Sequence, residues 1–336
     1  MLISVYVPFA GTAVLTLLAP RLARRLSPRP AAWALACAAL VMAVGWTGSL
    51  ALLAFTGIAQ IPQVAAEGHW SVTALRAEDP VYFVVAAVST WVLAASVVSL
   101  GVAAVRQVRQ VVRTRRECAG LRGRTELAVL DDDVPLAFAL PGRPGRIVVS
   151  RGMLRCLGDE ERAALLAHER AHLRARHHLF LRLWRLTAAL NPLLRPLADT
   201  GAFVLERWAD EEAAAQVGDR AVVARAVGHA ALASAGAPRP ALAVTGGEVP
   251  QRVRALLAPP PARRSLPFLA GALLLTVCCA SLANAASDSD RMVDSAKRAQ
   301  CAALMGTASA SPVDGHRHGP GLCCRHQRGE RGEHRA

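Results

Sequence analysis

The chain has 336 residues, of which 53% are hydrophobic and 4% aromatic, and its formal net charge is +14. With a mean hydropathy of +0.30, this composition excludes an ordinary soluble domain and predicts a membrane protein that also carries a soluble part. Nearly all of the basic residues are arginine, and much of this arginine flanks apolar segments, where orientation in a bilayer explains it; no nucleic-acid recognition motif accompanies it. Direct nucleic-acid binding is therefore not expected.

Three apolar segments near the start of the chain are long enough to cross a bilayer, at about residues 2–19, 31–55 and 81–105. The loop 20–30 carries four arginines and no acid, the loop 56–80 is acidic, and arginines follow the third segment again. Because positive loops stay in the cytoplasm, this alternation places the N-terminus outside and the residues after the third span inside. The first segment is interpreted as a span rather than a signal peptide, since its arginines follow it.

Beyond residue 125 the pattern changes to short strand-like runs at 126–130, 136–140 and 146–150, with a turn rich in Pro and Gly between the last two. These runs predict a small sheet. They open a predominantly helical soluble region that extends to a proline-rich linker at 259–261. A domain of residues 111–262 is therefore expected.

A helix is expected after the sheet, because Asp159 is a suitable N-cap and apolar residues recur at helical spacing beyond it. Within it, residues 168–172 read His-Glu-Arg-Ala-His, an H-E-x-x-H motif. On a helix, His168 and His172 lie one turn apart on one face, so both imidazoles can bind one tetrahedral Zn²⁺. Glu169 can reach the metal's water without being a ligand and can take its proton.

A second helix is predicted at 200–212, with Glu206 and Asp210 four residues apart on one face in an E-x-x-A-D pattern. Glu206 would complete a His₂Glu site with water in the fourth position, and Asp210 could accept the free ring N–H of a ligating histidine. Glu211 and Glu212 are rival ligands, but they point to other faces of the helix.

One Zn²⁺ per chain is the expected cofactor. A non-haem iron site uses the same ligand types but gives Glu169 no role. No side chain that would stabilise a tetrahedral oxyanion is identified, because both tyrosines belong to predicted spans. Continued as a helix, the chain would place His177 about 140° around from His172, so it is not expected to be a ligand. Weak candidates for the oxyanion role are His177, His178 and His229.

Toward the C-terminus, further helices are predicted at 219–235 and 249–257. A fourth span at 263–286 begins with two arginines and returns the chain to the outside. The tail 287–336 is expected to be a disordered extracytoplasmic segment. Its cysteines and histidines could bind a metal, although their spacing repeats no ligand pattern: His316, His318, Cys323, Cys324, His326 and His334.

Five motifs occur in the order found in one family: Ala137–Gly142, Arg146–Ser150, the 168–172 motif, Asn191-Pro192 and Glu206–Asp210. Together they resemble the BlaR1/MecR1-like membrane metallopeptidases of family M56, which are related to the HtpX-like M48 peptidases. The resemblance covers roughly residues 125–258. It implies an α-helical membrane protein with four transmembrane helices and a cytoplasmic α+β zincin-like (gluzincin) metallopeptidase domain between spans 3 and 4.

The resemblance also implies a function: zinc-dependent hydrolysis of peptide bonds in a protein substrate, in a bacterial plasma membrane. It further suggests regulatory signalling, with a transcriptional repressor or a membrane-associated protein as the substrate. In the metallopeptidases that the chain resembles, an edge strand binds the substrate in extended form. That the strands here form only a scaffold remains open.

Two other classes of function remain open. An HtpX-like quality-control peptidase would use the same site on misfolded membrane proteins, and a catalytically inactive membrane sensor or scaffold would use zinc for structure only. The tail beyond the fourth span is too short to supply a penicillin-binding sensor domain. A signal would therefore enter through the loop 57–80, the spans or a partner.

Overall fold

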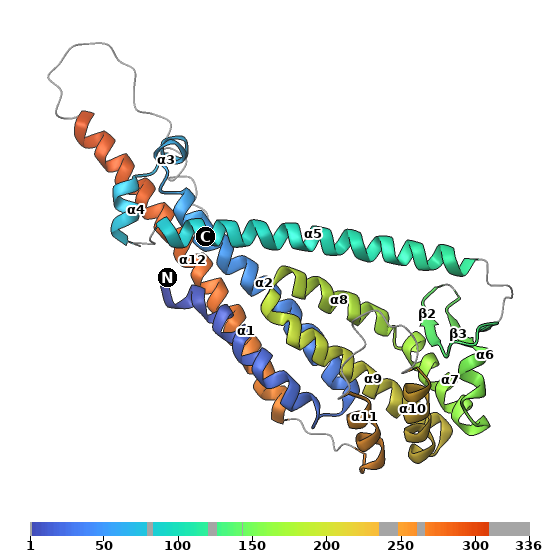
Figure 1. The fold of residues 1–336 in the computed structure, drawn as a ribbon. Helices are drawn as coiled ribbons and strands as arrows, with labels where there is room; N and C mark the ends of the chain where they lie inside the picture. Colours follow the sequence, from blue (N-terminus) through green and yellow to red (C-terminus); the bar gives the residue numbers. More distant parts are fainter. Residues whose placement is uncertain are drawn as a thin grey trace, which may run out of the picture. The chain divides into compact units, whose positions relative to one another are not determined.

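Helices dominate the computed structural model, which describes residues 2–78, 83–119, 126–142, 144–234, 248–260 and 266–308 (Figure 1). The elements before the sheet are α1 (Leu2–Ala23), α2 (Pro28–Ile58), α3 (Pro62–Gly68), α4 (Val72–Glu78) and α5 (Phe83–Ala119). The sheet consists of β1 (Leu127–Leu130), β2 (Ala137–Leu140) and β3 (Arg146–Ser150). The elements after it are α6 (Arg151–Arg155), α7 (Asp159–Arg174), α8 (His177–Leu190), the 3₁₀ turn η1 (Pro192–Leu194), α9 (Arg195–Val217), α10 (Arg220–Ser234), α11 (Glu248–Leu257) and α12 (Leu266–Ala308).

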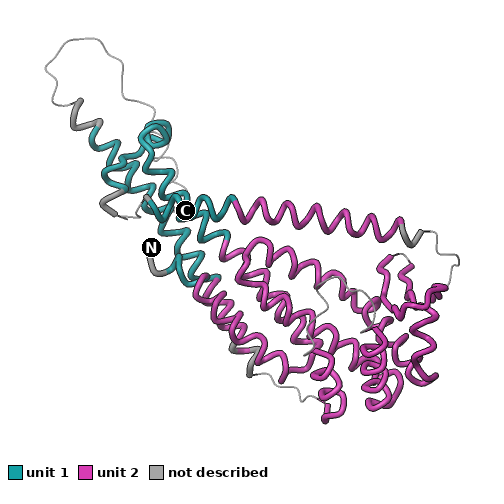
Figure 2. The backbone as a smooth tube through the Cα atoms, viewed as in Figure 1, with its two compact units in different colours: residues 1–8, 47–94, 279–336 teal, residues 9–46, 95–278 magenta. Residues whose placement is uncertain are grey.

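The chain forms two compact units (Figure 2). Unit 1 comprises residues 1–8, 47–94 and 279–336, and unit 2 comprises residues 9–46 and 95–278. The sheet and helices α6 to α11 all belong to unit 2. The candidate site is therefore built within one unit.

Among the residues that the structure describes, four helices contain stretches that are long and apolar enough to cross a membrane, judged by length and composition. The stretches are Ser4–Ala23 in α1, Pro28–Ile58 in α2, Val84–Arg116 in α5 and Gly271–Ala303 in α12. Each overlaps one of the four segments predicted from the sequence. The orientation of these helices in a bilayer remains a prediction.

Helix α12 shows that the prediction of a disordered tail beginning at residue 287 is wrong for residues 287–308, which continue the helix. Ala285, Ser289, Met292 and Ala296 are buried at helical spacing along it, and Met292 and Ala296 pack against Ala59 and Leu75 in unit 1. The polar composition of this segment favoured disorder, but its stripe of buried residues at helical spacing allows a packed helix. The six histidines and cysteines proposed as possible metal ligands in the tail lie outside the described residues.

The three strands form one sheet in the order β1-β3-β2, close to the three strand ranges expected from the sequence. β3 is central and runs parallel to β1 and antiparallel to β2, with Phe138 opposite Val148. Its residues Ile147, Val148 and Val149 are completely buried, as the apolar character of that strand requires. Within the described residues, β2 pairs only with β3 and is an edge strand.

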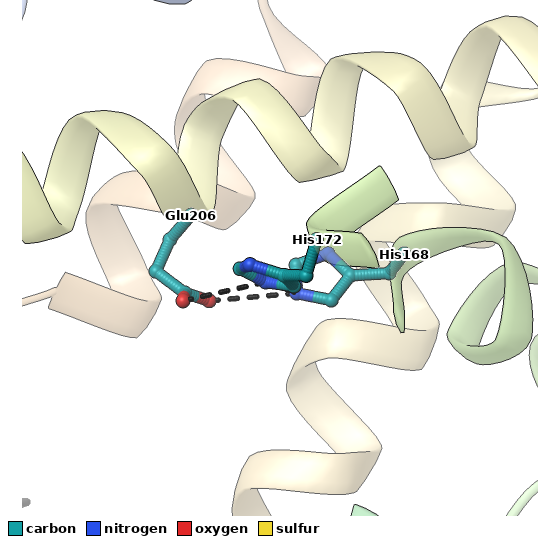
Figure 3. Close-up of side chains that lie close together, drawn as sticks. All are labelled: His168, His172 and Glu206. Atoms are coloured by element: carbon teal, nitrogen blue, oxygen red, sulfur yellow. Dashed lines mark hydrogen bonds and ion pairs between the residues drawn. The ribbon is translucent and has the colours of Figure 1, made fainter. Parts of the chain in front are cut away.

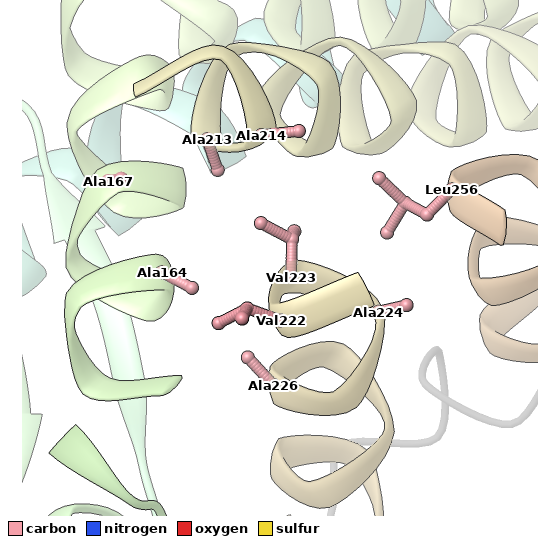
Figure 4. Packing of buried hydrophobic residues seen from close by; sticks show 9 residues of the cluster. All are labelled: Ala164, Ala167, Ala213, Ala214, Val222, Val223, Ala224, Ala226 and Leu256. Carbon is pink, nitrogen blue, oxygen red and sulfur yellow. The ribbon is translucent and has the colours of Figure 1, made fainter. Parts of the chain in front are cut away.

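Small side chains bring the helices of unit 2 close together. Helix α7 packs against α9 and α10 through a cluster of buried apolar residues (Figure 4): Ala164, Ala167, Ala213, Ala214, Val222, Val223, Ala224, Ala226 and Leu256. Burial of each valine in this cluster contributes about 1.5–3 kcal/mol. Elsewhere, α8 approaches α9 closely, because a Cβ on Gly201 would lie 2.6 Å from the ring of the buried Trp184. These contacts fix α7 against α9, the two helices that carry the predicted ligands.

Candidate metal centre

The H-E-x-x-H motif lies in the second half of α7, whose N-terminus is capped differently from the prediction. Gly158, not Asp159, is the N-cap, and its backbone N–H donates to Glu161 Oε2 at 3.2 Å. Asp159 is the first helical residue, where its charge still suits the helix dipole. His168 and Glu169 are both buried, at 8% exposure each.

His168 and His172 of α7 meet Glu206 of α9 at one point (Figure 3). The two Nε2 atoms lie 3.1 Å apart, and they lie 3.4 and 3.6 Å from the Glu206 oxygens. Ligand atoms around a tetrahedral Zn²⁺ with bonds near 2.0–2.1 Å are separated by about 3.3 Å. The three side chains therefore fit a zinc ion with little movement.

The other ring nitrogen of each histidine has a partner of its own. His168 Nδ1 lies 3.0 Å from Asp210 Oδ1, without the alignment of a full hydrogen bond, and His172 Nδ1 lies 2.9 Å from His177 Nδ1. Contacts of this kind orient ligating imidazoles and fix which nitrogen faces the metal. Here they leave both Nε2 atoms directed at Glu206.

His177 lies closer to the site than the sequence analysis allowed. The position expected for His177 assumes a helix that is continuous past His172, but α7 ends at Arg174 and α8 begins at His177. Arg176 between them adopts a left-handed backbone conformation with φ of 53°, which turns the chain back. His177 is thus a buried neighbour of His172, and its ring also packs on Trp208.

The charges at the site are strongly coupled. Burial disfavours the charged form of His168, but Asp210 and Glu206 outweigh burial and raise its pKa to about 10. Burial lowers the pKa of His172 to about 4, so this ring is neutral at pH 7. Glu206 is 35% exposed and only partly desolvated, and the neighbouring Arg252 holds its pKa well below the usual range.

Glu169 has the surroundings that a general base requires. Burial raises the pKa of this carboxyl, and the negative charge of Glu206 raises it further, whereas His168 and Arg252 act in the opposite direction. The backbone of Ala139 in β2 hydrogen-bonds its carboxylate. Glu169 therefore stands between the ligand cluster and the free edge of the sheet.

Arg252 is the residue of the site that the sequence analysis missed. It projects from α11, and its Nη1 lies 2.9 Å from Glu206 Oε2. Its Nε and Nη2 donate to both oxygens of Asp210, at 2.8 and 2.7 Å. This planar, two-pronged contact is the geometry that arginine favours with carboxylates. The sequence did place Arg252 in the predicted helix 249–257. Nothing in the local sequence, however, indicated that it would pair with Glu206 and Asp210.

The other candidate residues lie away from the cluster. Glu211 pairs with Arg220, and Glu212 accepts a hydrogen bond from Trp208 Nε1 at 3.2 Å, so neither rival ligand faces the histidines. His229 lies 3.0 Å from Glu161 near the start of α7. His178 lines a separate pocket beside α5.

Comparison with known proteins points to one class of enzyme. Residues 103–191 match the model of Peptidase family M48, about a quarter of the chain, including the 168–172 motif but ending before Glu206. The match supports an M48-type peptidase domain. It does not support the narrower resemblance to the BlaR1/MecR1-like family M56.

One relative can be named for a short segment. Over 53 residues, the chain is 51% identical to the mitochondrial metalloendopeptidase OMA1 of Schizosaccharomyces pombe. The matched segment covers 16% of this chain and only 15% of that relative's length. No solved structure matches the chain.

Proposed function

We propose that the protein is a membrane-embedded, zinc-dependent endopeptidase. The observation that carries this proposal is the convergence of His168, His172 and Glu206 at distances that suit Zn²⁺, beside the buried carboxylate of Glu169. The match to Peptidase family M48, which includes the 168–172 motif, supports the same reaction. In this proposal the three residues hold one zinc ion per chain, and Asp210 orients His168.

Each side chain has a distinct task in the proposed hydrolysis. A bound Zn²⁺ would supply a Lewis acid that polarises the scissile carbonyl and lowers the pKa of water. Glu169 takes a proton from the attacking water and later delivers it to the leaving amine, a role that its raised pKa suits. Asp210 and His177 hold the two imidazoles in place.

The edge strand β2 is suited to hold the peptide. Leu136 accepts a hydrogen bond from Ser150 of β3, and backbone groups alternate in direction along a strand, so the groups of Ala137 and Ala139 face away from β3. An extended substrate that pairs with these groups would lie against Glu169. Main-chain pairing accepts varied side chains, which suits an endopeptidase.

The substrate is proposed to be a protein at the membrane, reached from the cytoplasmic side, with the N-terminus and C-terminus of the chain outside. A regulatory role, with cleavage of a transcriptional repressor or a membrane-associated protein, follows from the family resemblance of the motifs. The M48 match favours a second candidate, a quality-control peptidase that degrades misfolded membrane proteins. Breadth of cleavage separates the two: one defined site indicates regulation, and many unrelated sites indicate quality control.

The test uses the full chain purified in detergent with zinc. We expect it to cleave an unfolded model protein, and we expect Glu169→Gln to retain zinc while activity falls by about 10²–10⁴-fold. Glu160→Gln, an exposed position on the same helix, should leave the rate unchanged. A zinc-loaded protein that cleaves neither proteins nor peptides would support the inactive sensor or scaffold instead.

A further inference from the structure

A basic pocket of about 170 Å³ lies between α5, α8 and the end of β2, within unit 2. We define it by its cationic lining residues, Arg115 of α5 and Arg182 and Arg185 of α8, together with His178. Polar donors from α5 and the apolar surfaces of Leu140 and Pro141 complete the lining, which contains no carboxylate.

The helices themselves create this concentration of positive charge. His178, Arg182 and Arg185 recur at spacings of four and three residues, so they share one face of α8. Gln107 of α5 donates to the backbone carbonyl of Arg182 at 3.4 Å and holds the two helices together. Burial and the neighbouring positive charges of Arg182 and Arg176 lower the pKa of His178.

None of the pocket's three arginines forms an ion pair with another described residue. The salt bridges of this part of the chain involve other arginines, such as Arg170 with Glu126 and Arg151 with Asp131. Guanidinium groups that face a pocket without an acidic partner are suited to bind a carboxylate or phosphate from outside.

The position of the pocket relative to β2 favours a peptide as the source of that anion. Ala139 contacts Glu169, and the next two residues, Leu140 and Pro141, line the pocket. A strand rises about 3.3 Å per residue, so Pro141 lies roughly 7 Å along the edge from the contact with Glu169. A substrate strand paired with β2 would therefore carry a side chain into the pocket about two residues from the scissile bond.

A lipid headgroup is a less suitable source. If the bilayer covers the apolar residues only up to 105, the predicted end of the third span, Arg115 lies ten residues further along α5, about 15 Å beyond that point at 1.5 Å per residue, although the stretch of α5 apolar enough to cross a membrane continues to Arg116. The pocket would then stand clear of the headgroup region, at the level of the soluble domain.

We propose that the basic pocket is a specificity subsite that binds an acidic side chain, Asp or Glu, about two residues from the scissile bond of the substrate. This inference rests on the proposed peptidase function, because it names the substrate class of the same site. It also gives a role to the arginines of α8, which the zinc site does not use.

The test is a set of quenched-fluorescence peptides that carry Glu, Gln or Lys at each position within three residues of the cleavage site. With the full-length, zinc-loaded protein, kcat/KM for Glu should exceed that for Gln by about ten- to a hundredfold at one position, and Lys should be poorest. The double variant Arg182→Gln/Arg185→Gln should lose this preference while it retains zinc and its rate on the Gln peptide. Arg109→Gln makes the same kind of substitution at one arginine of α5 outside the pocket and should retain the preference.

The outcomes separate the two proposals. Cleavage of no peptide by the zinc-loaded protein would overturn the peptidase function itself. Equal cleavage of the Glu, Gln and Lys peptides would overturn the subsite alone. An unchanged peptide preference in the double variant, with weaker binding to vesicles of anionic but not zwitterionic lipid, would assign the pocket to a headgroup and also overturn the inference.

Discussion

Arg252 Nη1 lies 2.9 Å from Glu206 Oε2, while the same guanidinium bonds both oxygens of Asp210. One largely buried cation thus pairs with both the proposed third zinc ligand and the carboxylate that orients His168. Two acids so close together would otherwise repel each other in a site of low dielectric constant. Helix α11 is therefore part of the site, although it lies far from the 168–172 motif in sequence.

The first prediction concerns the loss of this cation. Arg252→Ala should destabilise the zinc-free protein by about 3–5 kcal/mol, because it leaves two carboxylates without their buried partner. Zinc should restore more stability to this variant than it adds to the unchanged protein, since the ion supplies the missing positive charge. Thermal unfolding in detergent, with and without zinc, measures both effects.

Arg252→Lys is the matched control, because it retains the charge but lacks the planar fork. The stability of Arg252→Lys should fall between that of Arg252→Ala and that of the unchanged protein. An equal loss of stability with and without zinc in Arg252→Ala would show that the arginine only packs and has no electrostatic link to the metal.

A second prediction tests the role of Asp210. Asp210→Asn should weaken zinc binding by about 10- to 100-fold, because the group that faces His168 Nδ1 loses its charge. Competition with a chromophoric chelator measures the affinity. Unchanged affinity would mean that Asp210 serves only to pair with Arg252.

The third prediction concerns the close approach of α8 and α9. Gly201→Ala would place a Cβ 2.6 Å from the Trp184 ring, and such overpacking costs about 1–3 kcal/mol. Gly228→Ala in α10 meets nothing within 4 Å, so it should stabilise the protein by up to about 1 kcal/mol through helix propensity. Opposite shifts of the unfolding midpoint are expected, and an unchanged or raised midpoint in Gly201→Ala would contradict the tight α8–α9 contact.

A fourth prediction concerns pH. Burial opposes the charge of Glu161, but His229 and the Gly158 N–H outweigh it and lower the pKa of Glu161. A carboxyl whose folded pKa is lowered contributes stability above its unfolded pKa, near 4.3, and the contribution is lost as pH falls through the folded pKa. Glu161→Gln, which retains an acceptor for Gly158, should therefore be less stable at pH 7, by up to about 1 kcal/mol.

The stability gap between Glu161→Gln and the unchanged protein should narrow as the pH is lowered below about 4.3. Unfolding midpoints measured from pH 7 downward test this behaviour. A gap that is independent of pH would mean that the amide disturbs packing and that the charge of Glu161 has no effect.

The parts of the site that the sequence predicts well depend on local spacing. His168 and His172 had to share a helical face once α7 formed, and Glu206 and Asp210 had to do the same on α9. The strands around β3 were also close to their predicted bounds, because their apolar runs are short and separated by turn residues. That these residues bind zinc remains a proposal.

The parts that the sequence did not predict depend on tertiary packing. Arg252 meets Asp210 across 42 positions, and only the packing of α11 against α9 creates that contact. His177 reaches His172 because Arg176 adopts a left-handed backbone conformation. Glycine is the residue that usually marks this conformation in a sequence, and none is present at this position. The helical residues 287–308 were missed because their small buried side chains alternate with polar ones.

The zinc content of the full chain, purified in detergent, tests the central claim most directly when measured beside Glu206→Ala and the matched control Glu212→Ala. Glu212 lies on the same helix, accepts a hydrogen bond from Trp208 and is not part of the cluster of His168, His172 and Glu206. We expect about one zinc per chain in the unchanged protein and in Glu212→Ala, and a strong loss of zinc in Glu206→Ala. No zinc in the unchanged protein, or equal zinc in Glu206→Ala, would contradict the His₂Glu centre.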